Sequence, residues 1–343
     1  QLPMNEKYGL SAHDGGQRVP REMALQLLRT LTGFDAPTYA VFVGTTPTIT
    51  NTMLLVSEAH RATRRHPITG ALLGTFGEGV LQNPMGISLL SRGHVLFGQQ
   101  GVRGLQILNV VDNGKYLVQS CCNFDDRNEK HRIDSALGVA ASDEQLAFVA
   151  DVTGYTVSAH NIGSLSERVW SAGQYNISSE LKRATGCTDS PAKAGTPFNG
   201  PSCFNPHGLG YSPRNGGRLF VADADNGALV VLNARTGAFV KAIRDSRLFS
   251  TPRGVAVTKS NRLLVVERQR IVLLSLNGRR IISEMNHVAG AVNMLGVSVD
   301  EDDKKAYVAD PGANAVFVFG LPDADVEVDD GRPRVELRSK RGR

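Results

Sequence analysis

Leu-Phe-Val-Ala-Asp at 219–223 decides the fold, because closely similar pentapeptides recur along the whole chain. Ala-Phe-Val-Ala-Asp stands at 147–151, Ala-Tyr-Val-Ala-Asp at 306–310 and Leu-Leu-Val-Val-Glu at 263–267. Leu-Leu-Val-Ser-Glu at 54–58 is a weaker copy, and Val-Leu-Phe-Gly-Gln at 95–99 lacks the acid. Recurrence of one unit every 40–50 residues or so indicates a repeat architecture.

A glycine in a short apolar stretch precedes the copies, at Gly86, Gly138, Gly208, Gly254 and Gly296, and we expect Gly44 to serve the first copy. The clearest unit, 206–243, contains short apolar segments separated by turns rich in Gly, Asn and Asp. Such a unit is a four-stranded antiparallel meander. Its strands are apolar on both faces, so each sheet must be covered by neighbours. The sequence therefore predicts an all-β, six-bladed β-propeller.

Several phrases resemble NHL repeats, notably 205–210, 220–223 and 315–320. The resemblance covers about 37–320 and implies a six-bladed propeller. It says little about activity, because this fold hosts unrelated functions.

We expect one domain with two appendages. Residues 1–36 would form an N-terminal extension with a short helix, because Ala24, Leu27, Leu28 and Leu31 have helical spacing. Residues 37–325 would form the propeller, with an insertion loop at 176–203, and 326–343 a basic tail. Ring closure would pair the last blade with a strand at 39–43 or at 326–328, and the sequence leaves this choice open.

The net charge of +5 comes from residues 331–343, so the remainder of the chain is neutral. Some NHL propellers bind RNA on a basic face, and a neutral body makes nucleic acid the third choice of partner. No apolar run is long enough to predict a membrane span.

The insertion carries signs of an oxidising compartment. Cys187 and Cys203 bracket it, and we expect a disulfide between them, while the state of Cys121 and Cys122 stays open. Asn176 begins a glycosylation sequon at the start of the same segment. Together these features favour an extracellular or secretory-lumen glycoprotein.

The repeat acids have two interpretations. As a ring around the axis, Asp151, Asp223 and Asp310 could hold calcium, and His207, at the start of an inner strand, could join them or bind zinc. We favour turn stabilisation instead, because nearly every unit has such an acid. We therefore expect no cofactor, with calcium or zinc as the alternative. His60 could also approach the axis and keeps the metal interpretation open.

The segment 60–66 is unusual, because it falls where a buried third strand is expected. It contains His60, Arg61, Arg64, Arg65 and His66. Buried unpaired arginines are costly, so we expect an exposed strand or one that faces an anionic partner. These residues are our candidates for partner binding.

The function we favour is a non-enzymatic extracellular module that mediates protein–protein contacts or self-assembly, since no complete catalytic motif is visible. The alternative is a metal-dependent propeller enzyme, similar to peptide-amidating lyases or to lactonases. A small-molecule substrate is not favoured.

Overall fold

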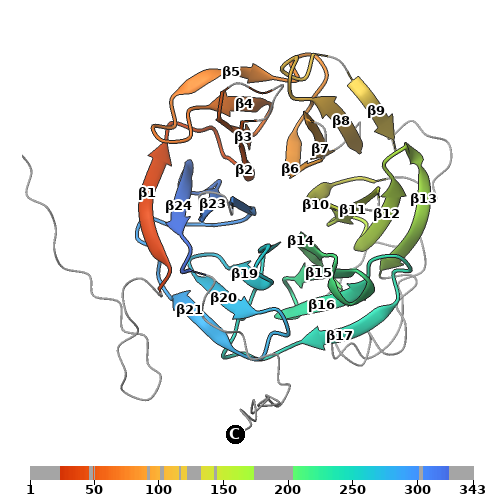
Figure 1. Cartoon of the computed structure of the whole chain (residues 1–343), viewed down its shortest axis with the longest axis vertical. Helices are drawn as coiled ribbons and strands as arrows, with labels where there is room; N and C mark the ends of the chain where they lie inside the picture. Colours follow the sequence, from red (N-terminus) through yellow and green to blue (C-terminus); the bar gives the residue numbers. More distant parts are fainter. Residues whose placement is uncertain are drawn as a thin grey trace, which may run out of the picture.

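Six four-stranded antiparallel sheets surround a central channel in the computed structural model (Figure 1). The structure describes residues 24–45, 49, 51–90, 93–100, 104–115, 117–121, 133–142, 145–173, 204–300 and 304–323. The predicted six-bladed propeller is thereby confirmed. Among the described residues, no helix has the length and apolarity needed to cross a membrane.

The blades follow the order of the repeats, and each runs from an inner strand at the channel to an outer strand at the rim. Blade one contains β2 (Tyr39–Val43), β3 (Met53–Ser57), β4 (Ala62–Arg65) and β5 (Leu72–Phe76). Blade two contains β6 (Pro84–Leu89), β7 (His94–Gln99), β8 (Leu105–Asn109) and β9 (Leu117–Cys121). Blade three contains β10 (Ala136–Ala141), β11 (Leu146–Asp151), β12 (Thr156–Asn161) and β13 (Ser164–Gly173).

The second half repeats the pattern. Blade four contains β14 (Pro206–Ser212), β15 (Arg218–Asp223), β16 (Ala228–Asn233) and β17 (Phe239–Ile243). Blade five contains β18 (Gly254–Val257), β19 (Arg262–Val266), β20 (Ile271–Ser275) and β21 (Ile281–Met285). Blade six contains β22 (Val297–Asp300), β23 (Lys305–Asp310), β24 (Ala315–Gly320) and, as its outer strand, β1 (Gln26–Thr32).

Ring closure by β1 corrects two predictions. Residues 26–32 form a strand rather than a helix, in antiparallel register with β24 from Gln26↔Gly320 to Thr32↔Ala315. The strand at 39–43 is the inner strand of blade one, and 326–328 lies outside the described residues. The helical spacing was misleading because the open edge of β24 offers a row of backbone hydrogen bonds, which outweighs a weak local preference.

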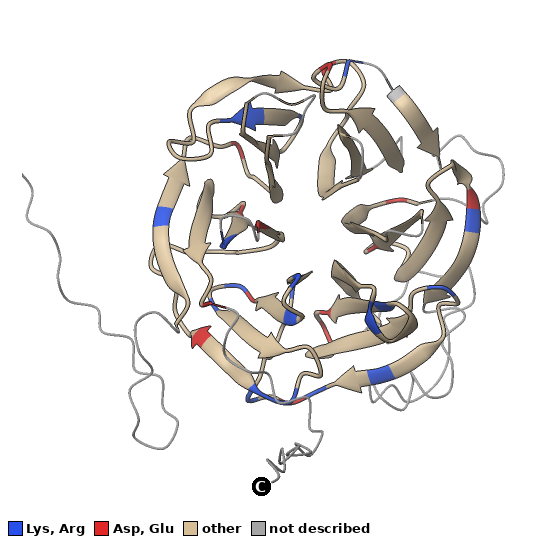
Figure 2. Cartoon of the chain, in the orientation of Figure 1, with Lys and Arg blue, Asp and Glu red and all other residues tan. Residues whose placement is uncertain are grey.

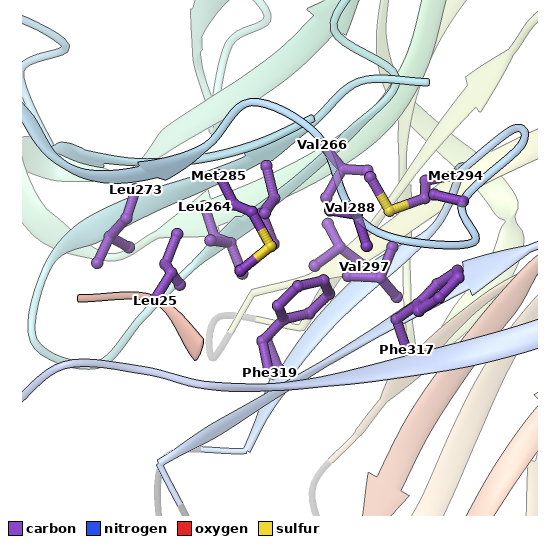
Figure 3. Close-up of a cluster of buried hydrophobic side chains, with 14 of the residues drawn as sticks. Leu25, Leu264, Val266, Leu273, Met285, Val288, Met294, Val297, Phe317 and Phe319 are labelled. Carbon is purple, nitrogen blue, oxygen red and sulfur yellow. The ribbon is translucent and has the colours of Figure 1, made fainter. Parts of the chain in front are cut away.

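The core lies between adjacent blades. Figure 3 shows one such cluster, in which Leu25, just before β1, packs with side chains of blades five and six. Its labelled members are Leu25, Leu264, Val266, Leu273, Met285, Val288, Met294, Val297, Phe317 and Phe319. Because both faces of the sheets are covered in this way, second strands such as β11 and β15 are apolar and buried, whereas outer strands such as β1 are partly exposed.

The anchor glycines sit where inner strands of neighbouring blades approach closely. A Cβ on Gly86 would lie 2.7 Å from the carbonyl oxygen of Leu137, and one on Gly208 would lie 2.7 Å from that of Arg253. Only glycine allows this approach. In blade one the position belongs to Tyr39, which pairs with Ser57 just before Glu58. The expectation that Gly44 serves this blade is therefore wrong, since Gly44 follows the far end of β2.

Candidate functional site at the channel mouth

The acid at the end of each second strand holds the chain that enters the same blade. Asp151 accepts backbone hydrogen bonds from Asp134 and Ser135, both at 3.0 Å, and from Gly154 in the following turn at 3.0 Å. Asp310 does the same with Val292, Asn293 and Ala313 at 2.8–2.9 Å. One carboxylate thus joins two segments that the turn and the preceding loop bring together.

The remaining blades use the same device. Asp223 accepts from the backbone of Asn205 at 3.0 Å, and Glu267 from Ser250 and Thr251 at 2.6 and 2.7 Å. Glu58 accepts from Asp35 at 3.0 Å. In blade two, Gln99 replaces the acid and its Oε1 accepts from Gln82 at 2.6 Å. We call these contacts the repeat staples.

The repeat staples engage the same acids that the metal interpretation would use as ligands. Within the described ranges, no three His, Cys, Asp or Glu side chains lie together as a metal site would need. Burial raises the pKa of Asp151 and raises that of Asp223 to about 6, against the opposing effect of their hydrogen-bond donors. The axial metal role of Asp151, Asp223, Asp310 and His207 stays a prediction, and each acid already has a structural role.

The basic segment is not the exposed strand that we expected. Arg65 is 5% exposed and forms an ion pair with buried Glu58, with Nη2 and Oε1 2.6 Å apart. Its guanidinium also stacks over Phe34, 4.7 Å from the ring centroid. Arg64 is half-buried, and its Nη1 donates to Asn113 Oδ1 at 2.8 Å. Internal partners therefore satisfy the two arginines, which is why β4 tolerates them.

The other members of the segment lie nearer to solvent. His60 is exposed, and its Nδ1 is 3.2 Å from Asn83 Oδ1. Arg61 is exposed. His66 Nδ1 accepts from the backbone of Ile68 and Thr69 in the next turn. Since β4 runs from Ala62 to Arg65, His60 and Arg61 lie at one end of it and His66 at the other, so the five residues do not form one patch.

One position does distinguish the blades at the channel mouth, namely the residue just before the anchor position, which is a glycine in five blades and Tyr39 in blade one. It is occupied by Thr38, Met85, Leu137, His207, Arg253 and Leu295 in successive blades. His207 and Arg253 are adjacent, because the backbone N–H of Gly208 donates to the carbonyl of Arg253 at 2.7 Å. Figure 2, which looks down the ring axis, shows basic residues close to the channel in blade five.

The polar groups of this pair are incompletely satisfied. Arg253 Nη1 donates to Asn293 Oδ1 at 2.6 Å. Arg253 Nε and His207 Nδ1 are buried without a hydrogen-bond partner among the described residues, and so is Asn205 Oδ1. Such groups are uncommon in folded proteins and mark places where a ligand can supply the partner.

Electrostatics makes the mouth cationic through Arg253 rather than through His207. Burial, together with the nearby guanidinium of Arg253, lowers the pKa of His207 to about 4, although Asp225 acts in the opposite direction. The imidazole is therefore neutral at pH 7. Burial and the nearby Arg268 also lower the pKa of Arg253, but an arginine keeps its charge at neutral pH.

Beyond the glycines, the channel contains a cavity of about 210 Å³ lined by all six inner strands. Most of the residues that line it are apolar, for example Val139, Leu209 and Val255, with Ser88 and Ser298 as polar members. The cavity is on the opposite side of the glycines from His207 and Arg253, since its lining residues follow the glycines in each strand.

The residues that indicated secretion fall mainly outside the described ranges. Asn176, Cys122, Cys187 and Cys203 are not described, so the predicted pairing and glycosylation stay predictions. Cys121, at the end of β9, is described and is not a free thiol.

Sequence reasoning placed His207 at the mouth but did not select Arg253. The signal was present, because Arg253 replaces an apolar residue immediately before an anchor glycine. Pairing it with His207 required knowledge that blades four and five are neighbours at that point.

These features define the class: a six-bladed β-propeller with a cationic channel mouth. No protein-family model matches the chain, and no curated protein matches it in sequence. Among solved structures, a gluconolactonase of Xanthomonas campestris is similar, with a TM-score of 0.57 and 11% identity over 86% of this chain and 90% of that one. A chain in a nidogen–laminin complex is similar with a TM-score of 0.50 and 11% identity, over 71% and 78%. At this identity the likeness shows the fold, and the NHL resemblance stays a prediction.

Proposed function

We propose that the chain is a non-enzymatic recognition module that binds a protein partner at the channel mouth. The observation that carries the proposal is the pair formed by Arg253 and His207, each of which buries a polar atom that has no partner in the described part of the chain. An acidic side chain of a partner would complete these hydrogen bonds. Contacts of this kind, between charged groups, are stronger than neutral ones.

The distribution of roles among the mouth residues supports recognition. The repeat staples occupy Asp151, Asp223, Glu267 and Asp310, so these acids serve the fold. The residue before each glycine, in contrast, varies between blades, as expected where a surface is adapted to one partner. The likeness to a chain in a nidogen–laminin complex supports the proposal, because that chain takes part in a protein–protein complex.

The proposal includes a location outside the cell. The sequon at Asn176 and the pair Cys187 and Cys203 in one insertion favour a secreted glycoprotein with a disulfide. Reducing and non-reducing peptide mapping would test the pairing, and a glycosidase shift of the protein made in a secretory host would test the sequon.

A peptide-display selection tests the binding function. Random peptides would be selected on the folded protein and then compared on Arg253→Met and on Arg279→Met. Arg279 is exposed in the turn between β20 and β21, in the same blade but at its opposite end, so it is a matched control. We expect enriched peptides to contain Asp or Glu and to lose binding only with Arg253→Met. Absence of enrichment, or equal loss in both variants, would contradict the proposal.

The competing function is a metal-dependent hydrolase, and the structural similarity to a gluconolactonase is the observation that favours it. Metal analysis of the purified protein and a lactone-hydrolysis assay with added calcium or zinc separate the two. Stoichiometric metal and turnover that both fall with His207→Gln would favour the enzyme over the binding module.

A further inference from the structure

If the proposed function holds, the polar groups of the channel mouth also define the chemistry of its ligand. Three buried side-chain atoms lack a hydrogen-bond partner among the described residues where blades four and five adjoin: Arg253 Nε, His207 Nδ1 and Asn205 Oδ1. His207 and Arg253 are close enough for the guanidinium to lower the pKa of the imidazole. The three atoms come from one narrow region, since Asn205 and His207 flank Pro206 and Gly208 contacts Arg253.

The chemistry of these groups selects an anion. The guanidinium Nε–H can only donate, and a neutral imidazole donates through whichever ring nitrogen carries the proton. An amide can present its NH₂ group after a flip, which changes no other atom. Three donors around one charged group match a planar oxyanion, and arginine favours planar carboxylates.

The charged side chains around the site favour a ligand that carries a single negative charge. Arg253 is the cation of the site and is held in place by Asn293 at 2.6 Å. Exposed Arg268 adds a second positive charge near Arg253, and exposed Asp225 opposes both. The local net charge is therefore +1, which matches a single carboxylate better than a phosphate of higher charge.

We propose that Arg253, His207 and Asn205 form a binding site for one carboxylate at the channel mouth. One oxygen of the ligand accepts from Arg253 Nε, and the imidazole and the amide serve the other oxygen. The carboxylate is that of an Asp or Glu side chain of the partner, or that of a free organic acid, since both present the same group.

Calorimetric titration with two probes tests the site and separates these sources. The first probe is succinate, with succinamide as its neutral analogue. The second is the blocked peptide acetyl-Gly-Ser-Asp-Ser-Gly-amide, with its Asn analogue. We expect saturable binding of the acids with dissociation constants in the millimolar range or below, and none of the neutral analogues.

Variants then assign the site. Arg253→Met should weaken binding about tenfold or more, as loss of a charge-assisted hydrogen bond does, while Arg279→Met should leave it unchanged. Arg253→Lys keeps the charge but lacks the Nε–H donor, so it should weaken binding to an intermediate extent. This variant replaces Arg253→Met as the test if Arg253→Met does not fold. His207→Gln should weaken binding less than Arg253→Met.

The outcomes separate the site from the function. Succinate binding that depends on Arg253, without peptide binding, would keep the carboxylate site and overturn the protein-recognition function. Peptide binding that is unaffected by Arg253→Met and by excess succinate would keep the function and overturn the site. Failure of both acids to bind the native protein, or equal binding of acids and neutral analogues, would overturn the site.

Discussion

The backbone N–H of Asn293 donates a hydrogen bond to Oδ1 of Asp310 at 2.9 Å. The side-chain Oδ1 of the same Asn293 accepts a hydrogen bond from Nη1 of Arg253 at 2.6 Å. A repeat staple of blade six therefore positions the cation that blade five contributes to the mouth. Asn293 therefore links a repeat staple, which is found in every blade, to the site at the channel mouth, which is found only where blades four and five adjoin.

Replacement of Asp310 by Asn should weaken both stability and ligand binding. The variant loses acceptor capacity for buried backbone donors, so we expect the free energy of unfolding to fall by about 1–3 kcal/mol. Asp151→Asn removes the equivalent staple in blade three, away from Arg253, and is the matched control. Urea unfolding should show similar losses for the two variants, and succinate titration should show weaker binding only for Asp310→Asn. Equal affinities would refute the link through Asn293.

Replacement of Gly86 by Ala should destabilise the ring. The added Cβ would lie 2.7 Å from the carbonyl oxygen of Leu137 and 2.9 Å from the backbone nitrogen of Val139, so two blades must separate locally. We expect a loss of about 1–3 kcal/mol, as for overpacked cores. Gly44→Ala is the control, because among the described residues its Cβ would meet only Phe42, at 3.7 Å. Thermal unfolding should distinguish the two variants by several degrees.

Leu25 tests the closure of the ring. Its side chain is fully buried in the cluster between blades five and six, so Leu25→Ala should cost about 2–5 kcal/mol. Leu28, three residues later, is 44% exposed, and Leu28→Ala should cost well under 1 kcal/mol. The helix that the sequence suggested would instead place Leu28, and not Leu25, on its apolar face. A larger loss for Leu28→Ala than for Leu25→Ala in denaturant unfolding would argue for that helix.

The Arg65–Glu58 pair should behave as a buried ion pair. Arg65→Met leaves the Glu58 carboxylate uncompensated in the interior, and we expect a loss of about 3–5 kcal/mol. The double variant Arg65→Met/Glu58→Gln should be more stable than Arg65→Met alone, because the stranded charge is gone. A double-mutant cycle by urea unfolding measures the coupling. If Arg65→Met is neutral for stability, the arginine serves a partner instead.

Acid should destabilise the protein through His207. The pKa of His207 is about 4 in the folded state and about 6.5 when unfolded. Between these values the unfolded chain binds a proton that the folded chain does not bind. The contribution of neutral His207 to the free energy of unfolding is therefore fully present above pH 6.5 and is lost as the pH falls towards 4. His207→Gln should therefore lose less stability than the native protein between pH 6.5 and about 4.5.

Asp223 must be controlled for in that measurement, because it acts in an overlapping window with the opposite sign. Its pKa is raised to about 6, so its protonated form favours the folded state as pH falls. Paired unfolding curves in the Asp223→Asn background isolate the contribution of His207. An unchanged pH slope on removing the imidazole would disprove its buried, neutral state.

The recurring pentapeptide was sufficient to predict the six blades, because its apolar strands, turns and glycine each reflect a contact made in every blade. The same regularity favoured a structural role for Asp151, Asp223 and Asp310. Local pattern failed at 26–32, where the partner strand lies almost 300 residues away in sequence and decides the conformation. It also failed at Arg65, because the strand pattern does not show that the side chain of Glu58 folds back onto the next strand and pairs with the guanidinium.

The mouth was harder to predict, since it depends on which blades are neighbours rather than on any one repeat. His207 and Arg253 occupy equivalent positions, and the sequence showed that equivalence. The distances and buried donors that make them a pair arise only when the two inner strands meet, with Gly208 against the Arg253 carbonyl.

The union of β1 with β24 has a consequence for biosynthesis. Five blades can each form from one continuous stretch, in the order in which the ribosome delivers them. The sixth must wait, because its outer strand is synthesised first and its inner strands last. During that interval β1 has an unpaired edge, which is the kind of surface that chaperones shield and that drives aggregation. A messenger truncated before residue 315 would therefore yield a chain that never completes its circle, however well the earlier blades have formed.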